Sequence, residues 1–573
     1  MRTVLVFVVL LPALLVRTHL TPGALNTGPG DLVVSLRNGP IRGQYQSVKG
    51  TERRVRQYLG VPFARPPTGP LRLTAPQSVE PWEEERDCTQ HPPMCVQDPE
   101  LVVNVSRIMS LHYTPPEVSE DCLYLNLYTP AEARPGDKLP VMFWIHGGGL
   151  MMGAASQFDG SALAAYENIV VVIIQYRLGI LGFLSTGDQH ARGNWGLLDQ
   201  LAALRWVQEN IESFGGDPQR VTIAGESAGA ISASILTLSP QAKGLFHGAI
   251  FQSGVSTIGS YTSNQPLVHT QIIANITGCS SSSSEEMVHC IRTKSKEQLI
   301  DATKKVKKPA GDRQRQMKIF LGGVVDNDFL HGTAEELLSK KEVLQVPVMM
   351  GITNHEFGWI LPQSFLPPGW ENGMNQDLIL TMVNMFNPSG VSSANRLITE
   401  EYLKEAQSPE EVRDRFLEVM GDLLMTLPVL KVAKYHAEAG APVFMYEFVY
   451  RAAVYQNHRP SFVKADHGDD VVFMFGGCFF NGHVKLIGNI SKQDEQFCRT
   501  MMSYWASFVR TGSPNGPGLV SWPQYNQNQQ DYMELGLTPV VKQKLKMDRV
   551  QFSTVTLPQK LEQLAAAAAK DTN

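Results

Sequence analysis

The sequence has no strong excess of charge of either sign and few cysteines for its length. Its 573 residues carry a formal net charge of -5, and 18% of them are charged. Because no basic excess is present, the chain lacks the electrostatic footprint of nucleic-acid binding, and we expect no nucleic-acid partner. Hydrophobic residues make up 43% of the chain, which is enough for a large core and excludes a chain that is disordered throughout.

Long hydrophobic runs are also scarce, and the longest lies near the N-terminus, from Val4 to Val16, directly after Arg2. A membrane-spanning helix needs about 20 apolar residues, and this run is shorter and contains Pro12. A basic residue followed by a short apolar run is typical of a secretory signal peptide. We therefore predict a signal peptide over residues 1–20, with an approximate boundary, and no transmembrane span. Without internal repeats or long linkers, residues 21–573 are predicted to form a single domain.

The cysteines and glycosylation sequons agree with a secretory route. Seven cysteines are present, and this odd number leaves at least one thiol unpaired within the chain. Cys279 and Cys290 bracket a run of serines, and a disulfide across such a flexible loop is physically reasonable. Sequons for N-glycosylation begin at Asn104, Asn275 and Asn489. Together with the leader, these features indicate a lumenal or extracellular protein.

Short apolar runs rich in Val and Ile alternate with segments of helical periodicity. The runs lack polar alternation, as expected of strands covered on both faces, and they are Pro140–Ile145, Ile169–Tyr176, Arg220–Gly225, Val346–Ile352 and Pro442–Phe448. Helices are predicted over Gly196–Ile211 and Glu410–Met425. This alternation predicts an α/β fold with a mainly parallel sheet, whose chemistry collects at the carboxyl ends of the strands. The basic segment Lys304–Lys318 is predicted to be a solvated loop, and the alanine-rich tail a short helix.

The stretch VTIAGESAGA, Val221–Ala230, places Ser227 between two glycines directly after an apolar run. A serine hydroxyl is a poor nucleophile at neutral pH and needs an adjacent base and a fixed, exposed position. A sharp strand-to-helix turn supplies that position, and glycines suit its crowded backbone. A tight turn without chemistry is the alternative. The run before the turn and the helix-like segment Ala230–Ser239 after it favour Ser227 as a nucleophile.

A second glycine-rich segment, Gly147–Gly149, follows the apolar run that ends at Ile145. Glycine amides can face a ligand without obstruction by side chains, and an ester-cleaving serine enzyme needs such donors for the developing oxyanion. The amide of Ala228, the residue after the serine, is another candidate donor. A flexible turn is the alternative for the glycines alone, but their occurrence together with the serine motif favours a catalytic role.

From about Gly39 to about Pro558, the chain closely resembles the vertebrate carboxylesterases of the cholinesterase/carboxylesterase family. The resemblance rests on ordered motifs that include YLGVPFARPPTGPLRL, SEDCLYLNLYTPA, VMFWIHGGGLMMGAAS, YRLGILGFLSTGD, FGGDPQRVTIAGESAGA, NHEFGW, KADHGDD and YWASFVRTGSPNG. It implies the α/β-hydrolase fold, with a large central, mostly parallel sheet flanked by helices and with helical lid or regulatory insertions.

The resemblance also implies the site residues. The catalytic triad maps to Ser227, Glu356 and His467, with His467 as the base and Glu356 as the acid that orients it. The implied oxyanion donors are Gly148, Gly149 and Ala228. His355, beside the acid, is expected to be a structural or surface residue. The family's disulfides map to Cys95–Cys122 and Cys279–Cys290, which leaves Cys88, Cys478 and Cys498 outside the usual pattern, with buried free thiols as the default.

The implied activity is that of a serine carboxylesterase acting on small-molecule or lipid esters through an acyl-enzyme intermediate. Amides and thioesters are further candidate substrates, and no metal or organic cofactor is required. Leu150, Met151 and Met152 are candidates for an apolar gorge wall, with simple packing as the alternative. The resemblance leaves the oligomeric state open.

Three other interpretations are kept. An acylglycerol lipase would use the same machinery. A cholinesterase is disfavoured because choline recognition needs aromatic residues, and the segment between Cys95 and Cys122 has no Trp. A non-enzymatic adhesion relative would be expected to lose the serine and to carry a membrane span.

Three departures from the family pattern stand out. Asp470 occupies a position where Glu is frequent, so a contact beside the site is expected to be weaker, and Asn327 stands where Gly is usual. The chain ends Lys570–Asn573 without a retrieval signal for the endoplasmic reticulum, which favours secretion over retention.

Overall fold

The computed structural model describes residues 32–263, 265–307, 321–387, 392–456 and 458–571. The predicted signal peptide and most of the basic segment Lys304–Lys318 lie outside these residues, although Lys304 to Lys307 end helix α8 (Lys296–Lys307). Within the described residues, no helix combines the length and the hydrophobicity needed to cross a bilayer.

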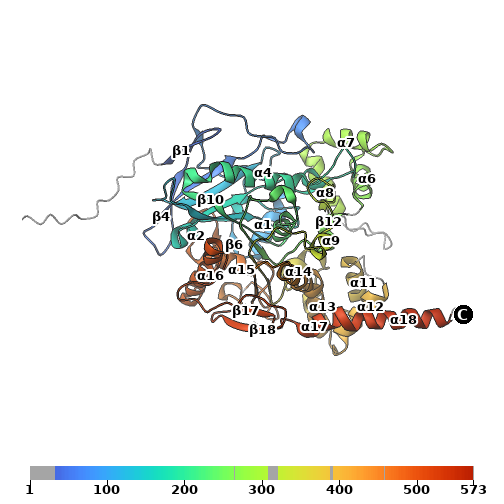
Figure 1. Cartoon of the computed structure of the whole chain (residues 1–573). Helices are drawn as coiled ribbons and strands as arrows, with labels where there is room; N and C mark the ends of the chain where they lie inside the picture. Colours follow the sequence, from blue (N-terminus) through green and yellow to red (C-terminus); the bar gives the residue numbers. More distant parts are fainter. Residues whose placement is uncertain (1–31, 264, 308–320, 388–391, 457, 572–573) are drawn as a thin grey trace, which may run out of the picture.

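A large mixed sheet forms the centre of the molecule (Figure 1). Its strands follow the order β18-β17-β15-β14-β11-β10-β8-β9-β7-β4-β3. All neighbours from β17 to β9 are parallel, and the pairs at the two ends are antiparallel. The strands are β3 (Gln44–Ser47), β4 (Arg54–Pro62), β7 (Tyr124–Pro130), β8 (Leu139–Ile145), β9 (Val170–Ile174), β10 (Gly216–Glu226), β11 (Gly248–Gln252), β14 (Val348–Thr353), β15 (Val443–Phe448), β17 (Asp531–Leu535) and β18 (Val540–Gln543).

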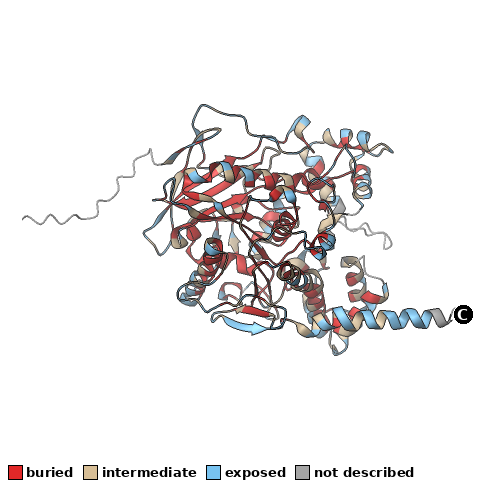
Figure 2. Cartoon of the chain, in the orientation of Figure 1, coloured by how far each residue is buried: buried red, intermediate tan, exposed pale blue. Residues whose placement is uncertain are grey.

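The central strands are buried on both faces, which explains their lack of polar alternation. Along β8, Val141, Phe143 and Ile145 enter one hydrophobic core, whereas Met142 and Trp144 enter another. The first core is completed by α4 (Trp195–Asn210), α5 (Ala228–Leu236) and α14 (Leu427–Glu438), and the second by α2 (Ser161–Glu167) and α16 (Lys492–Thr511). Figure 2 shows this buried interior between helices whose outer faces are exposed.

The predicted elements are present, with boundaries shifted by a few residues. Each predicted strand corresponds to one of β8, β9, β10, β14 and β15, and Gly196–Ile211 corresponds to α4. The second predicted helix forms α13 (Pro409–Gly421) and continues as a π-helical turn over Asp422–Thr426. The tail forms α18 (Leu557–Asp571), which is longer than the short helix expected.

A helical lobe is inserted between β14 and β15. It contains α10 (Ile360–Phe365), α11 (Gln376–Phe386), α12 (Ser392–Leu403) and α13. The lobe has a core of its own, which includes Phe357, Trp370, Ile379 and Phe416. The helical insertion implied by the family resemblance is therefore present.

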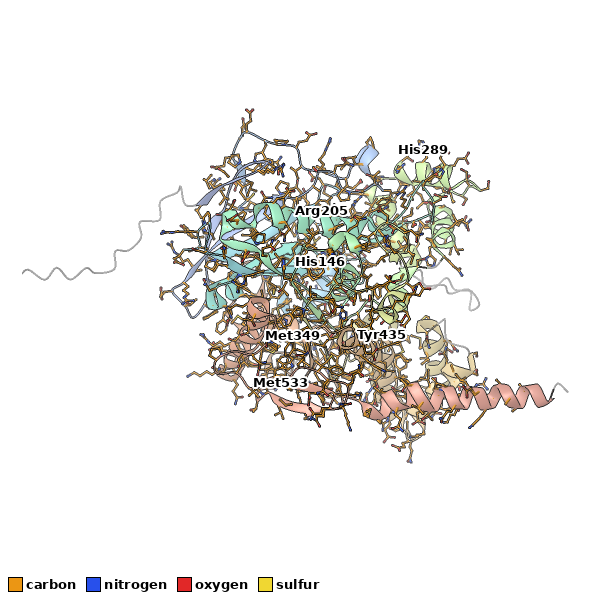
Figure 3. The ribbon with its side chains drawn as sticks, viewed as in Figure 1. His146, Arg205, His289, Met349, Tyr435 and Met533 are labelled. Atoms are coloured by element: carbon orange, nitrogen blue, oxygen red, sulfur yellow. A yellow bond between two sulfur atoms is a disulfide. The ribbon has the colours of Figure 1, made fainter. Side chains whose placement is uncertain are left out.

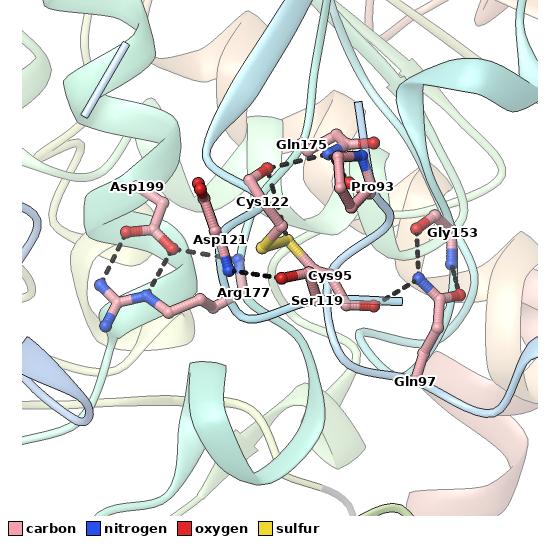
Figure 4. The surroundings of a disulfide bond; sticks show 10 residues. All are labelled: Pro93, Cys95, Gln97, Ser119, Asp121, Cys122, Gly153, Gln175, Arg177 and Asp199. Atoms are coloured by element: carbon pink, nitrogen blue, oxygen red, sulfur yellow. Dashed lines mark hydrogen bonds and ion pairs between the residues drawn. A yellow bond between two sulfur atoms is a disulfide. The ribbon is translucent and has the colours of Figure 1, made fainter. Parts of the chain in front are cut away.

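Three disulfides are present, one more than expected. The Cys95–Cys122 pair (Figure 4) and the Cys279–Cys290 pair match the prediction. The default of free thiols is wrong for Cys478 and Cys498, which are bonded because the chain turns back on itself between η10 (Gly477–Phe479) and α16. Cys88 is a buried free thiol, as expected.

Candidate active site

Ser227 is the single residue that joins β10 to α5, and its backbone is strained. Its φ and ψ angles are 56° and -125°, a conformation that residues other than glycine rarely adopt. The Ser227 amide donates to the carbonyl of Gln252 at 2.8 Å, which ties the turn to the end of β11. The predicted strand–turn–helix context is therefore confirmed, and it holds the serine at the carboxyl end of a central strand.

The glycines around Ser227 permit a close approach between backbones. A Cβ atom on Gly225 would lie 2.4 Å from the backbone carbon of Gly229. A Cβ atom on Gly229 would lie 2.0 Å from the carbonyl oxygen of Ile145, at the end of β8. Any larger residue at either position would push the turn away from the sheet.

The glycine-rich segment lies against the serine. Gly148 and Gly149 have φ angles of 99° and 64°, in the left-handed region, and a Cβ atom on Gly147 would lie 3.1 Å from the Cβ of Ser227. Among the described residues, the amides of Gly148 and Gly149 donate no hydrogen bond. Ala228 is the first residue of α5, where an amide has no intrahelical acceptor. These three amides are therefore free to bind an anion beside Ser227.

Gln97 holds Gly153, four residues after the glycine-rich segment (Figure 4). Its side chain accepts from the Gly153 amide and donates to the Gly153 carbonyl, both at 2.8 Å. Gln97 lies two residues after Cys95, so the Cys95–Cys122 disulfide stabilises the segment from which Gln97 reaches the loop.

Glu356 and His467 form a buried hydrogen-bonded pair. The imidazole Nδ1 donates to Glu356 Oε2 at 2.6 Å, and the residues are only 3% and 5% exposed. The other oxygen of Glu356 accepts from the Ser253 hydroxyl at 2.6 Å and from the Thr353 amide at 2.7 Å. Because Nδ1 carries the proton in this bond, Nε2 of a neutral His467 can accept a proton.

The structure brings the acid and the base together, but the serine is not hydrogen-bonded to the histidine within the described residues. Instead, His467 Nε2 lies 3.1 Å from Oε1 of Glu226, the residue before Ser227. Bonds between a catalytic base and its nucleophile are often long or misaligned in unliganded sites and tighten when substrate binds.

The carboxylates around His467 favour its charged form. Burial alone would lower the pKa of His467, but the nearby charges of Glu226 and Glu356 outweigh this effect and raise it above its ordinary value. Burial also raises the pKa of Glu226, to about 7, and the charge of His467 opposes this shift. The site is therefore built to stabilise an imidazolium ion.

Comparison with known proteins identifies the family of this chain. The model of the carboxylesterase family matches residues 30–553. The chain belongs to the carboxylesterase family. It is 45% identical over 534 residues to carboxylesterase 5A of Canis lupus familiaris, which covers 92% of this chain and 89% of the relative. It is 44% identical to the cocaine esterase of Oryctolagus cuniculus, with 93% and 97% covered. It is also 44% identical to the "Fatty acyl-CoA hydrolase precursor, medium chain" of Anas platyrhynchos, with 90% of each covered. The chain is thus a serine hydrolase of carboxylic esters with an α/β-hydrolase fold.

An apolar cavity of about 100 Å³ in this carboxylesterase is lined by Glu226, the residue before Ser227, and by Gly147 and Gly148. Its apolar lining includes Met109, Met152, Phe158, Val471, Phe475 and Phe480. Of the three candidate gorge residues, Met152 lines this cavity, whereas Leu150 is buried and Met151 faces a separate small pocket. Figure 3 labels His146, another lining residue, within the central part of the molecule.

Two expectations about neighbouring residues can be compared with the structure. His355 has a structural role, because its Nδ1 accepts from the Lys464 amide at 3.2 Å. Asp470 accepts from Gln252 and from the Tyr446 hydroxyl through one oxygen, at 2.9 and 2.7 Å, and its other oxygen has no partner within the described residues. The shorter carboxylate thus retains contacts on one oxygen only.

Sequence reasoning missed two residues of the site. Glu226 lies between Gly225 and Ser227, and its proximity to the histidine depends on how distant segments fold together. Ser253 directly follows β11, and no local pattern in the sequence signals its contact with Glu356.

Proposed function

We propose that this carboxylesterase cleaves esters through an acyl-enzyme formed on Ser227, with His467 as the general base and Glu356 as its orienting acid. The observation that carries the proposal is the 2.6 Å bond between Glu356 and His467, buried close to a serine on a strained turn. This arrangement matches the roles required of a catalytic triad.

The chemistry follows from the geometry. Neutral His467 takes the proton of Ser227 as its hydroxyl oxygen attacks the ester carbonyl, and Glu356 and Glu226 stabilise the imidazolium that forms. The amides of Gly148, Gly149 and Ala228 bind the developing oxyanion. His467 then gives its proton to the leaving alcohol. Water, activated by the same imidazole, hydrolyses the acyl-enzyme and releases the acid.

The cavity supports an apolar ester as the substrate. Its wall of aromatic, Met and Val side chains favours an alkyl or aryl group, and its volume of about 100 Å³ suits a small one. Thioesters are included because the duck relative is named as a fatty acyl-CoA hydrolase. Amides are the third class, since the same acyl-enzyme chemistry applies. An acylglycerol lipase remains the second candidate function.

We further propose a secreted glycoprotein whose leader covers residues 1–20 and whose catalytic domain covers residues 21–573. Three disulfides are consistent with an oxidising compartment. The three sequon asparagines, Asn104, Asn275 and Asn489, are exposed and so accessible to a glycosyltransferase.

Active-site labelling tests the proposed nucleophile. A fluorophosphonate probe is expected to label the wild-type protein covalently and to leave Ser227→Ala unlabelled, with turnover reduced by several orders of magnitude. Persistent labelling of Ser227→Ala would overturn the assignment. Nitrophenyl esters, acylglycerols, acyl thioesters and anilides, compared by kcat/KM, then separate esterase, lipase, thioesterase and amidase activity.

A further inference from the structure

The loops that carry Glu356 and His467 are joined directly to each other. Glu356 lies three residues after β14, and His467 lies two residues before α15 (Asp469–Met474), so more than a hundred residues separate them in the chain. Two side chains of the first loop accept hydrogen bonds from backbone amides of the second. Asn354 Oδ1 accepts from the Ala465 amide at 3.1 Å, and His355 Nδ1 accepts from the Lys464 amide at 3.2 Å.

Asp466, on the second loop, accepts three hydrogen bonds from backbone amides of the first loop. One carboxylate oxygen accepts from the amides of Gly358 and Trp359 at 3.1 and 3.0 Å, and the other accepts from the Ile360 amide at 2.8 Å. Asp466 is fully buried. It is adjacent to His467 in the chain, and the amides that it binds begin two residues after Glu356.

Asp469 and Arg459 pack beside the buried Asp466. Its amide donates to Asp469 at 2.8 Å, and the Arg459 guanidinium donates to the same carboxylate at 2.8 Å. The nearest guanidinium nitrogen of Arg459 lies 3.9 Å from the Asp466 carboxylate, and the guanidinium stacks on the Tyr455 ring at 3.8 Å. Buried carboxylates persist when they are paired and hydrogen-bonded in this way.

We propose that Asp466 is a positioning residue that fixes the distance between the acid and the base of this esterase. The inference rests on the proposed roles of Glu356 and His467. Asp466 binds the backbone just after Glu356 and directly precedes His467 in the chain. It therefore links the two residues on either side of their 2.6 Å hydrogen bond. A displacement of about 1 Å at a catalytic group can cost about a hundredfold in rate.

The test uses Asp466→Ala, Asp466→Asn and a matched control, Asp326→Ala. One carboxylate oxygen of Asp326, which is only partly buried, also accepts three backbone amides, at 3.1, 2.8 and 3.0 Å, and the other accepts from the Asn194 side chain at 2.8 Å. None of these bonds involves Glu356 or His467. The readouts are kcat and KM for a nitrophenyl ester across pH, the rate of fluorophosphonate labelling, and the thermal midpoint.

Five carboxylates face His467, and they are Glu226, Glu356, Asp466, Asp469 and Asp470. Because the charge of Asp466 raises the pKa of His467, its removal alone lowers that pKa and shifts the acidic limb of the kcat/KM profile to lower pH. The plateau above that limb is the diagnostic readout, because the histidine is neutral there in every variant. We expect plateau kcat and the labelling rate to fall about 10- to 100-fold in Asp466→Ala, with little change in KM. Asp466→Asn, which keeps one acceptor oxygen, should fall less.

The control separates positioning from general stability. Asp326→Ala is expected to lower the thermal midpoint while keeping wild-type plateau kcat. Plateau kcat and labelling at wild-type levels in both Asp466 variants would overturn the proposal, as would equal losses in Asp326→Ala. If Asp466→Ala does not fold, Asp466→Asn carries the same comparison. Failure of the proposed function would instead appear as labelling of Ser227→Ala.

Discussion

At the scale of single residues, Glu226 links the proposed nucleophile to the proposed base. It is bonded in the chain to Ser227, and its carboxylate lies 3.1 Å from Nε2 of His467, the nitrogen that we propose accepts the serine proton. A negative charge at that place stabilises the imidazolium and therefore raises the pKa of His467.

Replacement of Glu226 by Gln should move the acidic limb of the kcat/KM profile to lower pH. The base acts only when it is neutral, so activity rises as pH passes the pKa of His467, and loss of the Glu226 charge lowers that pKa. Plateau kcat should also fall, because the imidazolium of the transition state loses one stabilising charge. Because the nearby carboxylates raise the pKa of His467 to about 10, the measurement is kcat/KM from about pH 5 to about pH 11 for a nitrophenyl ester. An acidic limb that stays in place or moves to higher pH would contradict this prediction.

The roles of single residues could be predicted from the sequence only where those residues lie in a recognisable motif. Ser227 and the glycines around it follow from the need for a strained turn, and the structure has that turn. Glu356 and His467 were located through family resemblance, because nothing local distinguishes one buried acid or histidine from another. The contacts of Glu226 and Asp466 join segments far apart in the chain, and no local pattern specifies them.

At the scale of elements, the Cys478–Cys498 disulfide anchors the segment that follows the candidate base. Cys478 lies between Phe475 and Phe480, which line the apolar cavity, and Cys498 is fully buried on α16. The disulfide therefore fastens one wall of the cavity to a long helix of the second core.

The double variant Cys478→Ser/Cys498→Ser should be less stable by about 3 kcal/mol, as expected for a loop of this size. KM for esters with bulky acyl groups should rise more than kcat falls, because the loosened wall contacts substrate rather than the reacting atoms. Urea unfolding and steady-state kinetics measure both effects. Cys88→Ala, which leaves the disulfides intact, is the control, and an unchanged unfolding midpoint in the double variant would contradict the prediction.

Strands and helices were predictable because burial on both faces leaves a pattern in the sequence, and Val170–Ile174 illustrates this with every residue buried. The third disulfide was not predictable, since a cysteine pair depends on how η10 packs against α16. The same limit applies to the tail helix α18, whose alanines set its propensity but not its length.

At the scale of the whole molecule, the exposed sequons lie on three different elements or loops. Asn104 is on α1 (Pro99–Ile108), Asn275 is on α6 (Pro266–Thr277), and Asn489 precedes α16. None of the three side chains is buried.

Expression of the full chain in mammalian cells should therefore give secreted protein with three N-glycans. Each Asn→Gln substitution should remove one step from the mobility shift seen on enzymatic deglycosylation, and the triple variant should show none. Material retained in the cells at steady state would contradict the predicted secretion. A single variant without a mobility change would show that its site is unoccupied.

The position of the helical lobe has a consequence for how such enzymes diversify. The lobe leaves the sheet after β14 and returns at β15, and these two strands pair in parallel along their whole length, from Val348 with Val443 to Thr353 with Phe448. Because the strands are parallel, the lobe leaves at their carboxyl end and the chain re-enters at their amino end after α14. The pairing of β14 with β15 can therefore stay in register while the lobe changes in size or sequence. The lobe can thus diversify between relatives without disturbing the strand whose carboxyl end precedes Glu356.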